Sequence, residues 1–98
     1  MGLIIKSKKI SVTYEYPSEQ IIVQGSYEKD ATSGDITSIN GTCYVNNGGV
    51  IGAYIGNYNG YNNNGVFKYN FNDVSLSNLE LIQGVALEIE NEIKKVDK

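Results

Sequence analysis

The chain has 98 residues, eight lysines and eleven acidic residues, and its net charge at neutral pH is −3. This length predicts a single domain over residues 1–98, and the acidic balance argues against a nucleic-acid binder that neutralises phosphates. Histidine is absent, which removes the commonest general base and metal ligand. We therefore expect no cofactor and no metal. No apolar stretch approaches the roughly 20 residues that span a bilayer, so no membrane partner is expected.

The N-terminal apolar run, from Leu3 to Ile5, is too short for the core of a secretory signal. Cys43 is the sole cysteine, so no internal disulfide can form and a cytoplasmic location is the simplest expectation. We interpret the basic cluster as the solvated side of a strand rather than a phosphate site. It consists of Lys6, Lys8 and Lys9.

The first two predicted elements form a hairpin. Residues 9–16 alternate between apolar and polar side chains, which is typical of a half-buried strand. The apolar set is Ile10, Val12, Tyr14 and Tyr16. A turn at residues 17–19 follows, and the next run continues the alternation with Ile21, Val23, Gly25 and Tyr27.

The segment from Ile36 to Val45 has two interpretations. It forms either two short strands around an Asn40-Gly41 turn or one longer strand with a bulge at the glycine. We favour the bulged single strand because the apolar residues keep one parity across the glycine. The same parity turns Cys43 inwards, where we expect a buried, unreactive thiol. Residues 46–49 then turn the chain.

The middle of the chain is almost without charge. Only Lys68 is charged between Asp35 and Asp73, and four Asn-Gly pairs begin at Asn40, Asn47, Asn59 and Asn64. Such pairs between apolar residues are the strongest short-range signal of a hairpin. Charge normally keeps other molecules off sheet edges and faces, so this neutral region predicts a surface that meets a partner.

The next predicted strand mixes tyrosine and glycine. Ile51, Ala53 and Ile55 share one side, and the other side carries Gly52, Tyr54, Gly56, Tyr58 and Gly60. This alternation suggests aromatic rings lying over bare backbone on the open face. Residues 57–65 are expected to form a loose loop, whose lack of a carboxylate argues against a calcium site. The last strand then presents Phe67, Tyr69 and Phe71.

A helix is expected over residues 77–95. Ser77 and Glu80 have the spacing of a capping box, and Leu76 and Leu81 that of a hydrophobic staple. One apolar stripe is predicted from Ile82, Val85, Ala86, Ile89, Ile93 and Val96. Gly84 costs about 1 kcal/mol relative to alanine, so we expect it to approach the sheet or another chain closely.

These elements predict an α+β fold. It is an antiparallel β-meander of about five strands, all within residues 3–72, with one C-terminal amphipathic helix packed across one face. By parity, the open face carries Tyr44, Tyr54 and Tyr58, and the adjoining loop adds Asn59, Tyr61 and Asn63. Tyrosine offers large amphipathic contacts and asparagine adaptable hydrogen bonds, a combination favoured in protein-binding loops. The alternative is that the tyrosines only cover glycine backbone.

We interpret the chain as a small non-enzymatic protein-interaction or assembly module. Its partner would be a second copy, giving a homo-oligomer, or another protein. In one variant of this interpretation, the chain is an inhibitor or a structural component from a phage or mobile element. The alternative is a carbohydrate-binding module in which Tyr54, Tyr58 and Tyr61 hold a glycan. An enzyme is the third class, and its only candidate catalytic groups are the carboxylates of the first hairpin, Glu15, Glu19, Glu28 and Asp30. Nothing in the sequence fixes a pair of them at the separation that glycoside hydrolysis needs.

Overall fold

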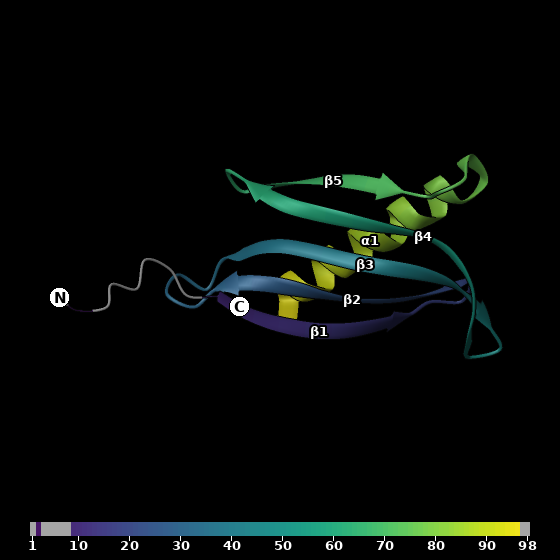
Figure 1. Cartoon of the computed structure of the whole chain (residues 1–98), viewed down its shortest axis with the longest axis horizontal. Helices are drawn as coiled ribbons and strands as arrows, with labels where there is room; N and C mark the ends of the chain where they lie inside the picture. Colours follow the sequence, from purple (N-terminus) through teal and green to yellow (C-terminus); the bar gives the residue numbers. More distant parts are fainter. Residues whose placement is uncertain (1, 3–8, 97–98) are drawn as a thin grey trace.

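The computed structural model describes residues 2 and 9–96. It confirms the predicted α+β fold, with a five-stranded antiparallel sheet in the order β1-β2-β3-β4-β5 and one helix against it (Figure 1). The elements are β1 (Lys9–Pro17), β2 (Ile21–Asp30), β3 (Ile36–Asn47), β4 (Val50–Asn63), β5 (Val66–Asn72) and α1 (Leu76–Val96). The predictions for residues 3–8, including Lys6 and Lys8, lie outside the described residues.

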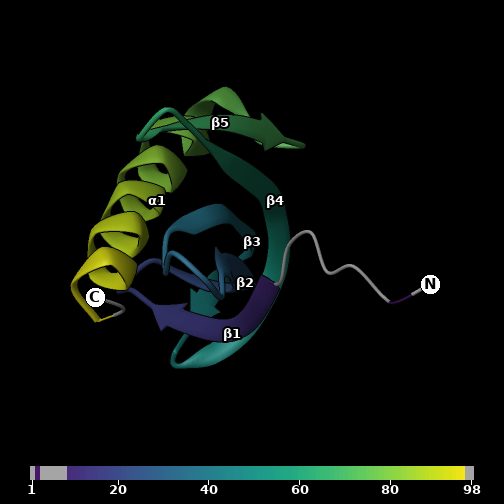
Figure 2. The ribbon, with the colours of Figure 1, turned by 90° about the vertical axis from the view of Figure 1, so that its left-hand side faces the viewer.

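The sheet has an inner face covered by α1 and an outer face that no described element covers. The sheet is twisted and curves around the helix, with β5 and β1 on opposite sides of it (Figure 2). Both edge strands bond to the helix from the inner face, since Tyr16 donates to Glu88 over 2.8 Å and Tyr69 donates to Glu90 over 2.6 Å. The inner face is therefore the concave one and the outer face the convex one.

The strand register aligns inner-face residues into rows that cross all five strands. One row contains Tyr14, Gly25, Gly41, Tyr58 and Phe71, and the next contains Val12, Tyr27, Ile39, Gly60 and Tyr69. The core lies between these rows and the helix, where the buried helical residues are Ile82, Val85, Ala86, Ile89 and Ile93. The apolar residues predicted for the inner face of the first hairpin belong to this core or pack against it, except Ile10, which is 43% exposed.

Only two of the four Asn-Gly pairs lie at turns. Gly48 and Gly49 (φ 64° and 93°) join β3 to β4, and Asn64 and Gly65 (φ 57° and 88°) join β4 to β5. These signs of φ are those of type I′ hairpin turns. The pair at Asn40 lies inside β3, which is a single strand as we favoured, but the register runs through it without the bulge we expected there.

The pair at Asn59 also lies inside a strand. The predicted loop over residues 57–65 is therefore wrong, because β4 continues to Asn63. Position 60 requires glycine because a Cβ there would lie 2.5 Å from Cε1 of Tyr69. The glycine makes room for a ring on the inner face rather than for a turn.

The helix begins one residue earlier than predicted, at Leu76. Its first turn is closed by the backbone N–H of Asn78, which donates to the carbonyl oxygen of Ser75 over 3.0 Å. Ser77 therefore lies within the first turn, and Leu76 is 90% exposed, so the predicted capping box and staple are wrong. Val96, the last residue of the predicted stripe, is 79% exposed, although it lines the same hollow as Ile89 and Ile93.

Gly84 does not approach the sheet. It is exposed, and a Cβ built there would meet no atom within 4 Å. The expected close contact with the sheet is wrong, while contact with another chain stays a prediction.

Candidate functional site

A bulge in β4 decides which tyrosines reach the surface. Cys43 pairs with Gly56 and Tyr44 pairs with Tyr54, so β4 has one extra residue, Ile55, between these two pairs. An extra residue reverses the alternation of every side chain that follows. Gly56 adopts φ 139° at this bulge, and a Cβ there would lie 2.5 Å from Cγ2 of Val74.

Tyr58 is consequently a core residue. It is 1% exposed, so its predicted place on the open face is wrong. Its ring lies against Gly41, where a Cβ would be 2.7 Å from Cε1 of Tyr58. Tyrosine rings do cover bare glycine backbone, as the sequence suggested, but they do so on the inner face, beneath the helix.

The hydroxyl of Tyr58 meets that of Tyr14 above the two facing glycines. The two oxygens are 2.8 Å apart, and Tyr14 donates to the carbonyl oxygen of Asn40. Since a phenol has one hydrogen to donate, Tyr58 must donate to Tyr14. Burial raises the pKa of Tyr14 to about 12, and burial raises the pKa of Tyr58 still further.

Cys43 lies in the same core and is 0% exposed. Burial raises the pKa of its thiol to about 11. The thiol therefore stays protonated at neutral pH, and the expected buried cysteine is confirmed.

The other five predicted residues lie on the outer face, all of them in strands. Tyr44 and Tyr54 face each other at one end with their rings 6.3 Å apart in an edge-to-face arrangement. The remaining three follow one another on alternate positions of β4 and are exposed, namely Asn59, Tyr61 and Asn63. Tyr61 pairs with Ser38, six residues along β3 from Tyr44, which separates the two ends by about 20 Å.

Between these ends, two rows of small polar side chains cross the whole sheet. We call them the amide rows. The first contains Thr13, Ser26, Asn40, Asn59 and Asn70, and the second contains Glu15, Gln24, Thr42, Asn57 and Asn72. Nine of these ten side chains are uncharged amides or hydroxyls. The two rows thus combine many hydrogen-bonding groups with a single charge, that of Glu15.

Hydrogen bonds between neighbouring strands hold these side chains in place. Asn40 donates to Ser26 over 3.1 Å, and Gln24 donates to Glu15 over 2.9 Å. At the other side of the sheet, a chain of donors runs from Asn72 to Asn57 (3.1 Å), from Asn57 to Tyr54 (2.7 Å) and from Tyr54 to Asp73 (3.1 Å). Tyr54 is therefore fixed to the second amide row while 47% of it remains exposed.

Sequence reasoning missed most of the amide rows. Only Asn59 was among the predicted site residues, because the rows exist only once the strand register and the β4 bulge are known. A partial signal is present in β5, where Asn70 and Asn72 alternate with the aromatic residues.

The carboxylates of the first hairpin do not converge. Glu15 and Glu28 lie four residues apart along the sheet, which is about 13 Å. Asp30 instead accepts the backbone N–H groups of Thr32 and Ser33 in the following loop. In the described part of the chain, no three side chains of the kinds that bind metals come together.

The one helix in residues 9–96, α1, contains too few apolar residues to cross a membrane. No protein-family model matches the chain, and its comparison with curated proteins and with solved structures gave no match. Its function is therefore inferred from the geometry of the molecule.

Proposed function

We propose that the chain is a small non-enzymatic module that binds a partner protein on the outer face of its sheet. The observation that carries this proposal is the pair of amide rows, which present nine uncharged polar side chains across five strands. Interface cores are depleted in charge, and tyrosine with small polar residues is the typical composition of protein-binding surfaces. The expected cytoplasmic location forms part of this proposal.

The shape of the face supports a macromolecular partner. Small ligands bind in concave sites, whereas the outer face is the convex side of the curved sheet (Figure 2). Three hollows in the described part of the molecule lie along α1, and another lies between the loop before β3 and the turn before β5. A partner protein with a flat or concave surface fits the outer face better than a small molecule does.

The fixed side chains support tight recognition. An immobilised side chain costs about 0.5–1.5 kcal/mol of conformational entropy at an interface. Asn57 and Asn72 are already held by hydrogen bonds in the free protein, so less of this cost remains to be met on binding. Asparagine amides can still offer further donors and acceptors to a partner.

The geometry weakens the glycan alternative. Its three predicted residues do not converge, because Tyr58 is buried and Tyr54 and Tyr61 lie about 20 Å apart along the strands. A single sugar ring cannot stack on both exposed tyrosines.

Substitution of the outer face tests the proposal. Asn59→Lys introduces a charge into the first amide row, and Tyr54→Ser removes the ring that accepts a hydrogen bond from Asn57 of the second row. The matched control is Asn91→Lys, which places the same charge on the exposed side of α1. Tagged protein, expressed in the cells that produce this chain, is used to capture partners for quantitative mass spectrometry, and the affinity for the purified partner is then measured.

We expect a stoichiometric partner whose affinity falls at least tenfold with Asn59→Lys and Tyr54→Ser but not with Asn91→Lys. Equal binding by all three variants would place the partner elsewhere and refute the proposal. Glycan-array binding that the two outer-face variants abolish would instead identify a carbohydrate-binding module.

A further inference from the structure

β5 is an edge strand that lacks the usual protection of sheet edges. It ends the strand order, so one side of its backbone pairs with β4 and the other pairs with no described strand. Natural edges are commonly blocked by charges, proline or bulges. β1 has Lys9, Glu15 and Pro17, whereas β5 has one charge, Lys68, and an unbroken register with β4.

The turn before β5 fixes which backbone groups point to the free edge. Asn63 and Val66 flank the type I′ turn and face each other in the ladder, so in a two-residue hairpin they form a hydrogen-bonded pair. Hydrogen-bonded and non-hydrogen-bonded pairs alternate along an antiparallel ladder. The N–H and C=O groups that point away from β4 therefore belong to Phe67, Tyr69 and Phe71.

A groove lies beside this free edge, between β5 and α1. We call it the β5–α1 groove; its volume is about 470 Å³, and its apolar wall includes Phe67, Tyr69, Phe71, Ala86 and Leu87. The three aromatic rings follow one another along β5, with centroids 6.2 Å and 6.1 Å apart. Leu87 is 57% exposed on the opposite wall.

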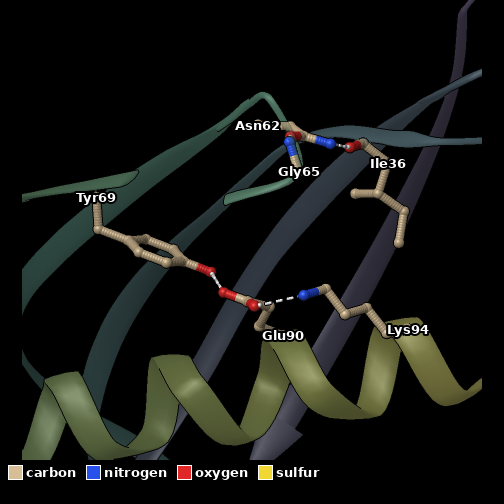
Figure 3. Close-up of polar contacts among 6 residues, drawn as sticks. All are labelled: Ile36, Asn62, Gly65, Tyr69, Glu90 and Lys94. Atoms are coloured by element: carbon tan, nitrogen blue, oxygen red, sulfur yellow. Dashed lines mark hydrogen bonds and ion pairs between the residues drawn. The ribbon is translucent and has the colours of Figure 1, made fainter. Parts of the chain in front are cut away.

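One polar contact joins the two walls of the groove, and others brace its surroundings (Figure 3). Tyr69 donates to Glu90 of the helix over 2.6 Å, and Lys94 pairs with the same carboxylate over 2.8 Å. At the end of the groove, Asn62 donates to the carbonyl oxygen of Ile36 over 3.1 Å and accepts from the backbone N–H of Gly65 over 2.8 Å. The groove thus places a row of aromatic rings, with polar groups of α1 opposite them, beside the edge of β5 that no described strand covers.

The sequence of β5 is symmetric about Tyr69. An aromatic residue stands two positions before it, Phe67, and two positions after it, Phe71. A two-fold axis through Tyr69 would pair Tyr69 with Tyr69 of a second copy, and Phe67 with Phe71 of that copy. These are the residues whose backbone groups face the free edge, so the arrangement forms about six hydrogen bonds.

We propose that β5 pairs antiparallel with β5 of a second copy of this chain, around a two-fold axis at Tyr69. The two sheets then continue as one ten-stranded sheet, and the aromatic side chains of each copy extend the inner face toward the groove and Leu87 of the other. An isologous contact of this kind needs a self-complementary surface. The aromatic symmetry of β5 supplies it.

The charges on the outer side of β5 agree with this pairing. Lys68 is brought opposite Asn70 of the second copy, so no charge directly faces a like charge. Directly opposed like charges would destabilise the pair. The inference goes beyond the proposed function and does not depend on it, because it uses the strand edge rather than the amide rows.

Opposite substitutions at Asn70 test the register. Asn70→Lys places a second cation opposite Lys68 of the other copy, and Asn70→Glu places a carboxylate there. Within one chain Asn70 faces the neutral Asn59, so both variants should leave the fold of the monomer intact. Circular dichroism at high dilution checks this.

Light scattering and sedimentation over a range of concentrations measure the association. We expect a dimer that Asn70→Lys weakens about tenfold and Asn70→Glu tightens about tenfold, because each change acts at two symmetric pairs. Both effects should shrink in molar salt. The double variant Lys68→Glu with Asn70→Lys restores opposite charges and should dimerise as well as Asn70→Glu.

A disulfide trap provides a second measurement. Oxidation of a mixture of Lys68→Cys and Asn70→Cys proteins should link one of each, because these positions face each other with Cβ atoms about 5 Å apart. Each protein alone should cross-link far more slowly. A protein that stays monomeric at every concentration, or a dimer indifferent to both Asn70 substitutions, would overturn the edge pairing. A dimer broken by Tyr54→Ser instead would place the contact on the outer face.

Discussion

Tyr54 and Tyr58 lie four residues apart on the same strand but face opposite sides of the sheet. Tyr54 is 47% exposed beside the amide rows, and Tyr58 is 1% exposed over glycine backbone. The difference comes from one extra residue, Ile55, in the β4 bulge. Local composition around the two tyrosines is nearly the same, so the register with β3 determines whether a tyrosine builds the core or the surface.

Truncation of the two tyrosines should give the largest contrast. Tyr58→Ala leaves a cavity in the core and should lower the free energy of unfolding by about 4 kcal/mol. Tyr54→Ala should lower it by less than about 1 kcal/mol. Urea unfolding followed by circular dichroism measures both, and equal losses would contradict the assignment of the two faces.

A methyl group added in the inner-face row between Tyr14 and Tyr58 should have the next largest effect. In Gly25→Ala, the new Cβ would lie 2.0 Å from the carbonyl oxygen of Asn40 and 2.8 Å from Cα of Gly41. Because these are backbone atoms that cannot rotate away, we expect a loss of about 3 kcal/mol. Ser26→Ala on the outer face is the matched control, with an expected change of about 0.5 kcal/mol.

Alkaline pH should also destabilise the packing of the inner face. The folded state holds the pKa of Tyr14 at about 12, above the ordinary value of 10.0, so between these values it keeps a proton that the unfolded state releases. This stabilisation is complete below pH 10 and is lost as the pH rises toward 12, at about 1.4 kcal/mol per pH unit for each such phenol. Tyr58 adds to the same loss, because burial also raises its pKa.

Unfolding measured between pH 7 and pH 11.5 checks this expectation. Tyr58→Phe removes one of the phenols whose pKa burial raises, so it should flatten the alkaline decline. A decline as steep in this variant as in the parent protein would contradict a buried, protonated Tyr58.

The smallest expected effect is a gain in stability. Gly84→Ala should stabilise the protein by about 1 kcal/mol, because alanine is the better helix former and the new Cβ has open space around it. Thermal unfolding measures the gain, and light scattering accompanies it. Weaker self-association in this variant would mean that Gly84 contacts another chain.

The sequence predicted those parts of the fold that depend on local pattern. The alternation in β1 and β2 and the apolar stripe of α1 each follow from one segment. The β4 bulge could not be predicted in this way, because Ile55 becomes an extra residue only in the pairing with β3. The amide rows could not be predicted for the same reason, since every row takes one residue from each of five separate strands.

The misplaced loop has a related cause. Asparagine and glycine are depleted in strands, so residues 57–65 resemble a turn when they are considered alone. In the folded protein, Asn59 belongs to an amide row and Gly60 accommodates the ring of Tyr69. Contacts with other strands thus override the local preference, and an Asn-Gly pair can mark a crowded strand as well as a turn.

The position of α1 after all five strands in sequence has a consequence for biosynthesis. All four strand pairings join neighbours in sequence, so the sheet can assemble hairpin by hairpin while the ribosome is still translating. The aromatic side that later becomes the core stays in contact with water until the 21-residue helical segment emerges. Nascent chains that stall before this point would expose it to aggregation, which makes the docking of α1 the step that commits the molecule to its native state.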